Sequence, residues 1–546
     1  MVKRIADFNF RKFINALDWK LLLFLIFFLN VKLAVKISAV IIIYLLQFNF
    51  RFGFSYKNSR LPLFYLFIIG IAFIGLVANK NFSNPAYVVL FLTGIVFWGL
   101  CLLAVHQVKL SVENNDAEII RRTILVFFVI NAIISFCNIG LIIWESGTLN
   151  PYTYQGKYQK YFIGTGDYIR GLTFDTSTTN AVLNAFGVVY FLDKKKPVMV
   201  CICMAVLLLT GSNFTNIVLM GVLTLLFIFR SSRDQKSLIV ICLMFLVVFM
   251  AKVSPQNNKY VYETVANAIH PPKSVPVVPT GIKTQATAPG PEEIKQKIAR
   301  GYLDSLRHRL TKKQKPVSAA VPLIPKTNSG RILIARPDIN TPPYQTPTDT
   351  TQEQTALLAF INTHKTDLRL SAKNDFIPGM PGKVGSQLQT IRFFAKHPAK
   401  IIAGDGIGNF SSKLAFKATG LGFAGGYPAK YVYINKDFLL NHLDVYLNFF
   451  SKRVGFHSLT NSPYSVYDQL LAEYGLLGLA AFTVFYIWFF ARHYKRLTYG
   501  LPLLIIMLAM FSIDYWFEQL SVIIFFELML FLNIKETAQT RNYVQA

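Results

Sequence analysis

Apolar residues form a series of runs separated by short polar segments along most of the chain. About twelve runs are present, at roughly 17–31, 33–49, 61–78, 86–107, 122–144, 176–192, 197–211, 213–230, 237–252, 470–491, 500–512 and 516–534. A helix needs about 20 apolar residues to cross a bilayer, and several runs are shorter than that. The pattern predicts an all-α polytopic membrane protein with about twelve transmembrane helices.

The connections between the runs alternate in charge. Cations occupy the N-terminal segment, every second connection and the C-terminal tail, as shown by Lys3, Arg4, Arg11, Lys12, Arg51, Lys57, Arg60, Lys109, Arg121, Arg122, Lys194, Lys195, Lys196, Arg230, Arg233, Lys236, Arg492, Lys495, Arg496, Lys535 and Arg541. The other connections are poor in cations. The positive-inside rule therefore predicts that both termini are cytoplasmic. We expect a multi-pass membrane protein.

Composition supports a membrane protein and excludes several other classes. Of the 546 residues, 53% are hydrophobic and only 15% are charged, whereas soluble domains average about 25% charged residues. An ordinary soluble enzyme, a disordered chain and a collagen-like fibre are thereby excluded. The net charge of +28 comes largely from cations beside apolar runs, which predicts contact with membrane lipids and not with nucleic acid.

The connection between the ninth and tenth runs is long, and the topology places it on the outer side of the membrane. Fourteen of the 24 prolines lie between residues 253 and 350, so we expect 253–375 to be an extended, mobile insert. Residues 376–469 are aromatic and glycine-rich, which predicts an ordered cap. The expected organisation is nine transmembrane helices in 1–252, the insert, the cap, and three more helices with a cytoplasmic tail in 470–546.

The cap contains a glycine run with two possible roles. Gly404, Gly406 and Gly408 precede Asn409. The run is either a tight turn with positive φ or a set of backbone N–H groups that bind a phosphate or sugar oxygen. A dinucleotide-binding fold is rejected, because it needs a strand before the glycines and a helix after them.

Several motifs together resemble a known family. The glycine turn Gly404–Phe410 precedes Glu473–Gly478, which opens a span; Arg170–Phe174 precedes the sixth run; Thr210–Ser212 closes the seventh; and Arg392–His397 leads into the glycine turn. In their order and position they resemble the O-antigen ligase and O-antigen polymerase superfamily of bacterial inner-membrane glycosyltransferases.

The resemblance implies a fold and a reaction. The fold is GT-C-like, with a large periplasmic loop between spans nine and ten. The reaction is a metal-independent, inverting-type transfer from an undecaprenyl-diphosphate-linked glycan donor to a glycan or lipid acceptor, without a cofactor. The family often has a His-Asn pair where this chain has Tyr464 and Ser465, and often has Arg at the position of Asn213. These departures favour a polysaccharide polymerase over a ligase.

The resemblance and the chemistry of a diphosphate leaving group imply roles for individual residues. Arg170 and Arg392 would neutralise the diphosphate, because a guanidinium group binds phosphate through two parallel hydrogen bonds. His457 is the first candidate for the base and His442 the second. The remaining candidates are substrate-binding: Gly404, Gly406, Gly408, Asn409, His442, Tyr464 and Glu473.

Each of these residues also has a structural interpretation, and other functions compete. Arg170 would anchor to head groups, Arg392 and His457 would be solvated, and Glu473 would cap a helix or fix the loop. A lipid-linked glycan flippase and a non-catalytic scaffold remain alternatives. Glu527 lies inside the twelfth run, where a charge is costly, so we expect it to face other helices and bond to a polar group.

Overall fold

The computed structural model describes residues 16–47, 61–147, 149–153, 165–253, 382–419, 427–442, 445 and 462–545. Every regular element in these ranges is a helix, which confirms the all-α prediction there. The predicted Pro-rich insert, from residue 254 onward, and His457 lie outside the described residues.

Each predicted apolar run contains a helix. The first nine are α2 (Trp19–Phe28), α3 (Leu33–Gln47), α4 (Phe64–Ala78), α5 (Pro85–Asn114), α6 (Ala117–Ser146), α7 (Ser177–Asp193), α8 (Pro197–Leu209), α9 (Asn213–Phe229) and α10 (Arg233–Val248). The C-terminal ones are α18 (Val466–Phe482), continued by η9 (Thr483–Ile487) and α19 (Trp488–Ala491), then α20 (Gly500–Met510), α21 (Trp516–Gln519) and α22 (Ser521–Gln545).

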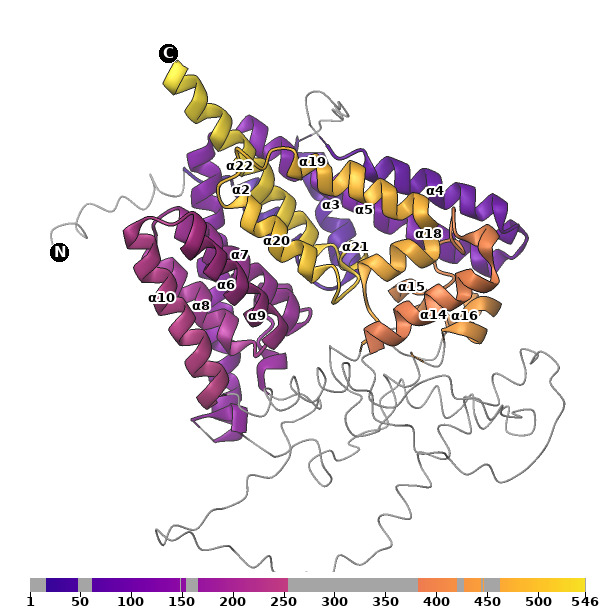
Figure 1. Cartoon of the computed structure of the whole chain (residues 1–546), viewed down its shortest axis with the longest axis horizontal. Helices are drawn as coiled ribbons and strands as arrows, with labels where there is room; N and C mark the ends of the chain where they lie inside the picture. The colour runs from indigo at the N-terminus through magenta and orange to yellow at the C-terminus, as the bar shows by residue number, and fades with distance from the viewer. Residues whose placement is uncertain are drawn as a thin grey trace, which may run out of the picture.

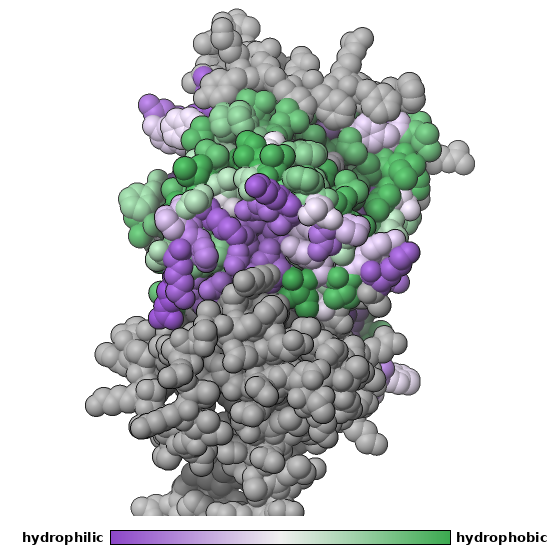
Figure 2. All heavy atoms as spheres, turned by 90° about the vertical axis from the view of Figure 1, so that its right-hand side faces the viewer, coloured by the Kyte–Doolittle hydropathy of each residue, from purple (hydrophilic) through white to green (hydrophobic). Residues whose placement is uncertain are grey.

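Four helical segments are long and apolar enough to cross a membrane, namely Pro85–Asn114, Ala117–Ser146, Arg233–Lys252 and Val466–Ala491. Six shorter apolar helices of 10–17 residues accompany them among the described residues. The apolar helices indicate a membrane-embedded protein. Figure 2 shows an apolar band across one face of the molecule, with hydrophilic residues gathered below it.

Helix α22 lies at the centre of the bundle and packs against α5, α6, α7, α20 and α21. Its residues from Val522 to Leu532 are all buried. Glu527 is among them, and the Tyr65 hydroxyl donates a hydrogen bond to its carboxyl group. The expectation that Glu527 faces other helices and bonds to a polar group is confirmed.

Basic residues hold several helix ends together at one end of the bundle. Lys535 donates to the carbonyl of Val112 at 2.7 Å, near the end of α5. Glu536 accepts hydrogen bonds from Arg121 of α6 at 2.5 Å and from Lys194, just after α7, at 2.8 Å. Residues that the sequence places in separate basic connections therefore meet at one end.

The described cap consists of three helices, α14 (Gly382–Lys396), α15 (Lys413–Ala418) and α16 (Lys436–Asn441). In Figure 1 they lie on the opposite side of the molecule from the C-terminal end of α22. Helix α14 packs against α16 and α18, and α15 packs against α5. The cap therefore packs directly against the apolar helices, and most of the candidate residues lie at this boundary.

Candidate site between the cap and the apolar helices

Helix α18 is interrupted at Gly475, whose φ of 65° and ψ of −163° are not helical. In an unbroken helix, the carbonyls of Ala472 and Glu473 would accept hydrogen bonds from N–H groups four residues later. Here they accept from the glycine turn instead, from Asp405 N–H at 2.9 Å and from Gly406 N–H at 3.0 Å. The turn therefore replaces two lost helix bonds.

The N–H groups beyond the kink donate to carbonyls of the segment just before the glycine turn. Leu476 N–H donates to the carbonyl of Ile401 at 2.8 Å, and Leu477 N–H donates to that of Ile402 at 3.1 Å. Four backbone hydrogen bonds thus join the cap to the interrupted helix. The two segments, about 70 residues apart in the chain, form one backbone unit.

The carboxylate of Glu473 is bound by backbone N–H groups of the glycine turn and the residues after it. Its two oxygens accept from Gly408 N–H at 2.8 Å, Phe410 N–H at 3.1 Å and Ser412 N–H at 3.0 Å. Successive N–H groups of this kind form an anion-binding concavity. The concavity predicted for a substrate oxygen thus holds a carboxylate of the protein itself. Glu473 does not cap the helix, whose N-cap is Ser465.

The glycines adopt the conformation that the turn interpretation predicts. Gly404, Gly406 and Gly408 have φ values of 74°, 94° and 71°. A Cβ atom on Gly404 would lie 2.4 Å from the backbone carbon of Glu473, so only glycine permits this approach. The structure brings the three glycines and Glu473 together.

An ion-pair triad stabilises the glycine turn. Lys400 Nζ bonds to the carboxylates of Asp405 and Asp437, the latter at 2.6 Å. Burial raises the pKa of Asp405 to about 8, although the nearby Lys400 charge opposes that rise. Asn409 is fully buried, and its side chain donates to the Asp405 carbonyl at 2.6 Å. Asn409 therefore holds the turn and is closed to solvent in this conformation.

His442 is enclosed by aromatic rings. Its ring centroid lies 4.9 Å from that of Phe410, 5.7 Å from Phe416 and 6.0 Å from Phe438. The side chain is fully buried, and within the described residues neither ring nitrogen has a hydrogen-bond partner. Burial lowers the pKa of His442 to about 3. The imidazole is therefore neutral at pH 7 and is shielded from an acceptor hydroxyl in this conformation.

Tyr464 lies on the other side of Phe416. Its ring centroid is 5.9 Å from that of Phe416 and 4.9 Å from that of Tyr515. Its carbonyl accepts a hydrogen bond from Lys383 at 2.9 Å, and Lys383 also donates to the Ser462 carbonyl at 3.2 Å. Tyr464 thus belongs to the contact between the cap and the start of α18.

The two predicted arginines lie on different helical groups. Arg170 is half-buried and precedes η5 (Gly171–Thr173), which packs against α6 and α7. Arg392 is exposed on α14, whose neighbouring Phe393 and Phe394 are buried. Arg392 therefore points away from the helices on which α14 packs. The structure thus places the two arginines on separate elements, and both stay predictions as residues of the site.

Sequence reasoning missed a group of lysines and acids at the same boundary. Burial and the charge of Lys413, one turn away on α15, lower the pKa of Lys417, while Glu518 and Asp175 oppose this. Burial raises the pKa of Asp514, and the charge of Lys413 opposes that rise. These charges come from α15, α21, the α20–α21 turn and the segment before α7. The spacing of the two lysines, four residues apart and just after the glycine turn, was the available signal.

A further lysine lies close to this group but inside α3. Lys36 is 2% exposed, and its ammonium group donates to the Phe28 carbonyl at 2.7 Å and to Ser521 Oγ at 2.8 Å. Lys36 is therefore a buried charged residue within an apolar run, in addition to Glu527. Among the described residues, no group of three or more His, Cys, Asp and Glu side chains is placed to hold a metal ion.

Comparison with known proteins adds no name to this site. No family model, no curated protein and no solved structure matches the chain.

Proposed function

We propose that the protein is a membrane glycosyltransferase that takes a glycan from a polyprenyl-diphosphate-linked donor at the outer face of the membrane that it spans. Polymerisation of a surface polysaccharide is favoured, and ligation to a lipid acceptor comes next. The observation that carries the proposal is that Lys413 and Lys417 of the cap lie near acidic residues of the segment before α7, the α20–α21 turn and α21, at the boundary between cap and bundle. The resemblance of the ordered motifs supports the same reaction.

The proposed reaction needs cations at the position where the diphosphate leaving group departs. The acceptor hydroxyl oxygen attacks the anomeric carbon, the bond from that carbon to the diphosphate oxygen breaks, and the hydroxyl proton passes to a base. Negative charge then grows on the departing lipid diphosphate. Lysine ammonium groups and an arginine can stabilise it. We assign this role to Lys413, Lys417 and Arg170.

The base is proposed to be His457, which lies outside the described residues. His442 is the weaker candidate, because it is neutral, buried and surrounded by Phe410, Phe416 and Phe438. Glu473, Gly408 and Asn409 are assigned a positioning role, because their polar groups bond within the cap and α18. They would shape the substrate site without contacting the reacting atoms.

The decisive test uses the purified full chain with lipid-linked repeat units. Lys413→Gln and Lys417→Gln should each lower chain elongation roughly 30-fold, corresponding to about 2 kcal/mol for a lost hydrogen bond to a charged group. Lys430→Gln is the matched control, because Lys430 is an exposed cation of the same cap. Activity unchanged in both site variants, with normal protein levels, would refute the proposed site.

The proposal must also be separated from the flippase and scaffold alternatives. A flippase would move the lipid-linked unit across proteoliposome membranes without making a new glycosidic bond. A scaffold that works through the insert would fail when residues 255–350 are deleted, whereas the enzyme should still form glycan chains. New glycosidic bonds formed by the variant that lacks residues 255–350 would favour the transferase.

A further inference from the structure

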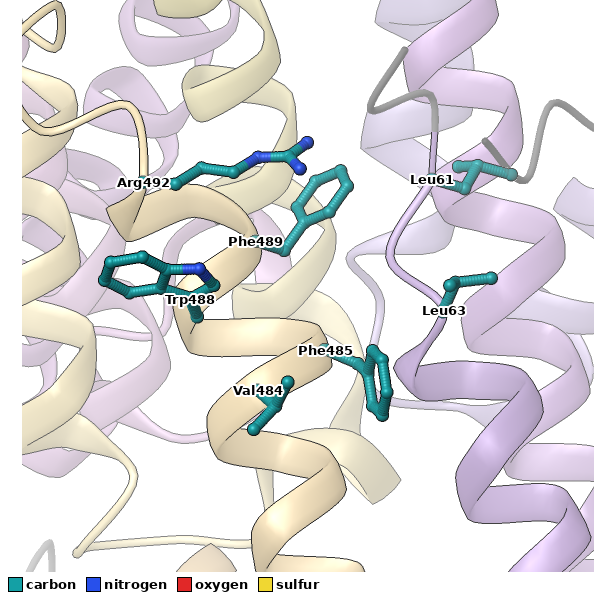
Figure 3. A pocket seen from close by; sticks show the side chains of 7 residues that line it. All are labelled: Leu61, Leu63, Val484, Phe485, Trp488, Phe489 and Arg492. Carbon is teal, nitrogen blue, oxygen red and sulfur yellow. The ribbon is translucent and has the colours of Figure 1, made fainter. Parts of the chain in front are cut away.

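A shallow groove runs between the segment just before α4 and the η9–α19 segment on the apolar surface. The space enclosed between its walls is about 10 Å³, and the rest is open to the surroundings. Six apolar side chains and one cation, Arg492, line it; the apolar ones are Leu61, Leu63, Val484, Phe485, Trp488 and Phe489. Figure 3 shows that Leu61 and Leu63, on the segment just before α4, face the helical segment that carries Val484, Phe485, Trp488 and Phe489 and ends at Arg492.

The wall that contains Val484 to Arg492 includes an irregular helical turn. Residues Thr483–Ile487 form a π-helix, and such bulges widen a helix and are frequent at functional sites. The Phe485 ring stacks on Phe67 of α4, with centroids 4.2 Å apart and planes within 7°. From Val484 to Arg492 the groove extends about 12 Å along the helix, at 1.5 Å per residue.

Arg492 is held at one end of the groove. Its guanidinium carbon lies 5.0 Å from the Phe489 ring centroid, and its Nε donates to His493 Nε2 at 3.3 Å. Burial and the neighbouring charges of Arg492 and Arg496 lower the pKa of His493, which suits a neutral ring that accepts this bond. In Figure 3 the guanidinium group extends over Phe489 toward the facing segment.

The charged end of the groove coincides with the cation-rich end of the bundle. Arg230, at the end of α9, donates to the carbonyl of Leu497 at 2.5 Å, and Lys495 and Arg496 follow Arg492 directly. By the positive-inside rule this end faces the cytoplasmic leaflet, which carries anionic lipids. The opposite end of the groove is apolar.

We propose that this groove binds one anionic phospholipid of the cytoplasmic leaflet, with an acyl chain along the apolar side chains of the η9–α19 segment and its phosphate on Arg492. Charge complementarity supports this occupant: a guanidinium group binds phosphate through its planar fork, and the groove beyond it is apolar. Trp488 and Val484 are 53% and 46% exposed, as expected for side chains that contact lipid. This inference does not depend on the proposed glycosyl transfer.

The test compares lipids that differ only in headgroup. The full chain is purified and exchanged into micelles that contain equal amounts of phosphatidylglycerol and phosphatidylcholine with the same acyl chains. Native mass spectrometry then measures the lipid retained. The wild type should retain phosphatidylglycerol at least fivefold more than phosphatidylcholine, and Arg492→Gln should abolish that preference. Equal retention of the two lipids by the wild type would overturn the proposal.

Two further variants distinguish the groove from general charge attraction. Arg496→Gln removes an exposed cation one turn away that does not line the groove, and it should keep the preference. Val484→Trp fills the groove without changing any charge, and it should lower retention at least fivefold. A preference lost equally in Arg492→Gln and Arg496→Gln, or retention unaffected by Val484→Trp, would each contradict binding in the groove.

Discussion

The roles of the polar residues at the boundary between cap and bundle depend on the residues around them. Glu473 and His442 both look like candidates for substrate chemistry in the sequence. In the structure, Glu473 accepts hydrogen bonds from three backbone N–H groups, and His442 is a neutral ring packed against aromatic side chains. Residue type limits what a side chain can do, and packing selects among the possibilities.

The burial of His442 predicts a loss of stability in acid. Its folded pKa is about 3, and its unfolded pKa is about 6.5. Between these values the unfolded chain binds a proton that the folded chain excludes, so stability falls as pH drops below about 6.5, by about 1.4 kcal/mol per pH unit. Lowering the pH from 6.5 to 5 should therefore cost about 2 kcal/mol. Thermal unfolding in detergent at both pH values measures the loss.

His442→Phe is the matched variant for this prediction. Phenylalanine fits among Phe410, Phe416 and Phe438, and neither imidazole nitrogen has a hydrogen-bond partner within the described residues. The variant should fold and should lose this part of the acid sensitivity. An unchanged pH dependence in the variant would show that other groups cause it.

At the scale of elements, the break in α18 decides how the cap is attached. The sequence predicts one continuous span beginning near residue 470, because its apolar pattern continues through Gly475. In the structure, Gly475 opens the helix and the glycine turn supplies the missing hydrogen bonds. Two short motifs that the sequence shows separately are thus one structural unit.

Gly475→Ala should weaken this unit. Its positive φ alone costs about 1–3 kcal/mol for another residue, and the added Cβ would lie 2.3 Å from the Ile402 carbonyl oxygen. We expect faster hydrogen exchange in residues 401–410 and a lower unfolding temperature. Gly99→Ala is the control, because nothing lies within 4 Å of that Cβ position in α5. Equal stability of the two variants would contradict this attachment.

At the scale of the whole molecule, contacts between helix ends agree with the predicted alternation of charge. The basic ends of α5, α6, α7 and α22 meet through Lys535, Arg121, Lys194 and Glu536, while the cap helices lie at a distance from them (Figure 1). We therefore propose the twelve-span topology with cytoplasmic termini and an outer cap.

Cysteine labelling in intact cells tests this topology. Lys430→Cys in the cap should react with a membrane-impermeant maleimide, and Arg496→Cys in the basic connection should react only after the cells are permeabilised. The exposed Cys137 and Cys201 would first be replaced by serine. Labelling of Arg496→Cys in intact cells, with none at Lys430→Cys, would invert the orientation and contradict the proposed outer site.

The helical class and the position of each apolar helix could be predicted from the sequence, and so could a tight turn at the glycines as one of two interpretations. These are local properties, because the length of an apolar run and the conformational freedom of glycine do not depend on distant residues. The residues that surround the site were harder to predict, because Lys413 and Lys417 carry only a weak signal in the sequence.

Contacts between distant segments of the folded chain set which polar groups already have hydrogen-bond or packing partners. They pair Glu473 with the backbone of the glycine turn, enclose His442, and place Lys413 and Lys417 near acids from distant segments. Burial and hydrogen bonding between residues far apart in the chain set the protonation and availability of each group. Because these partners come from separate helices, no local pattern could reveal them.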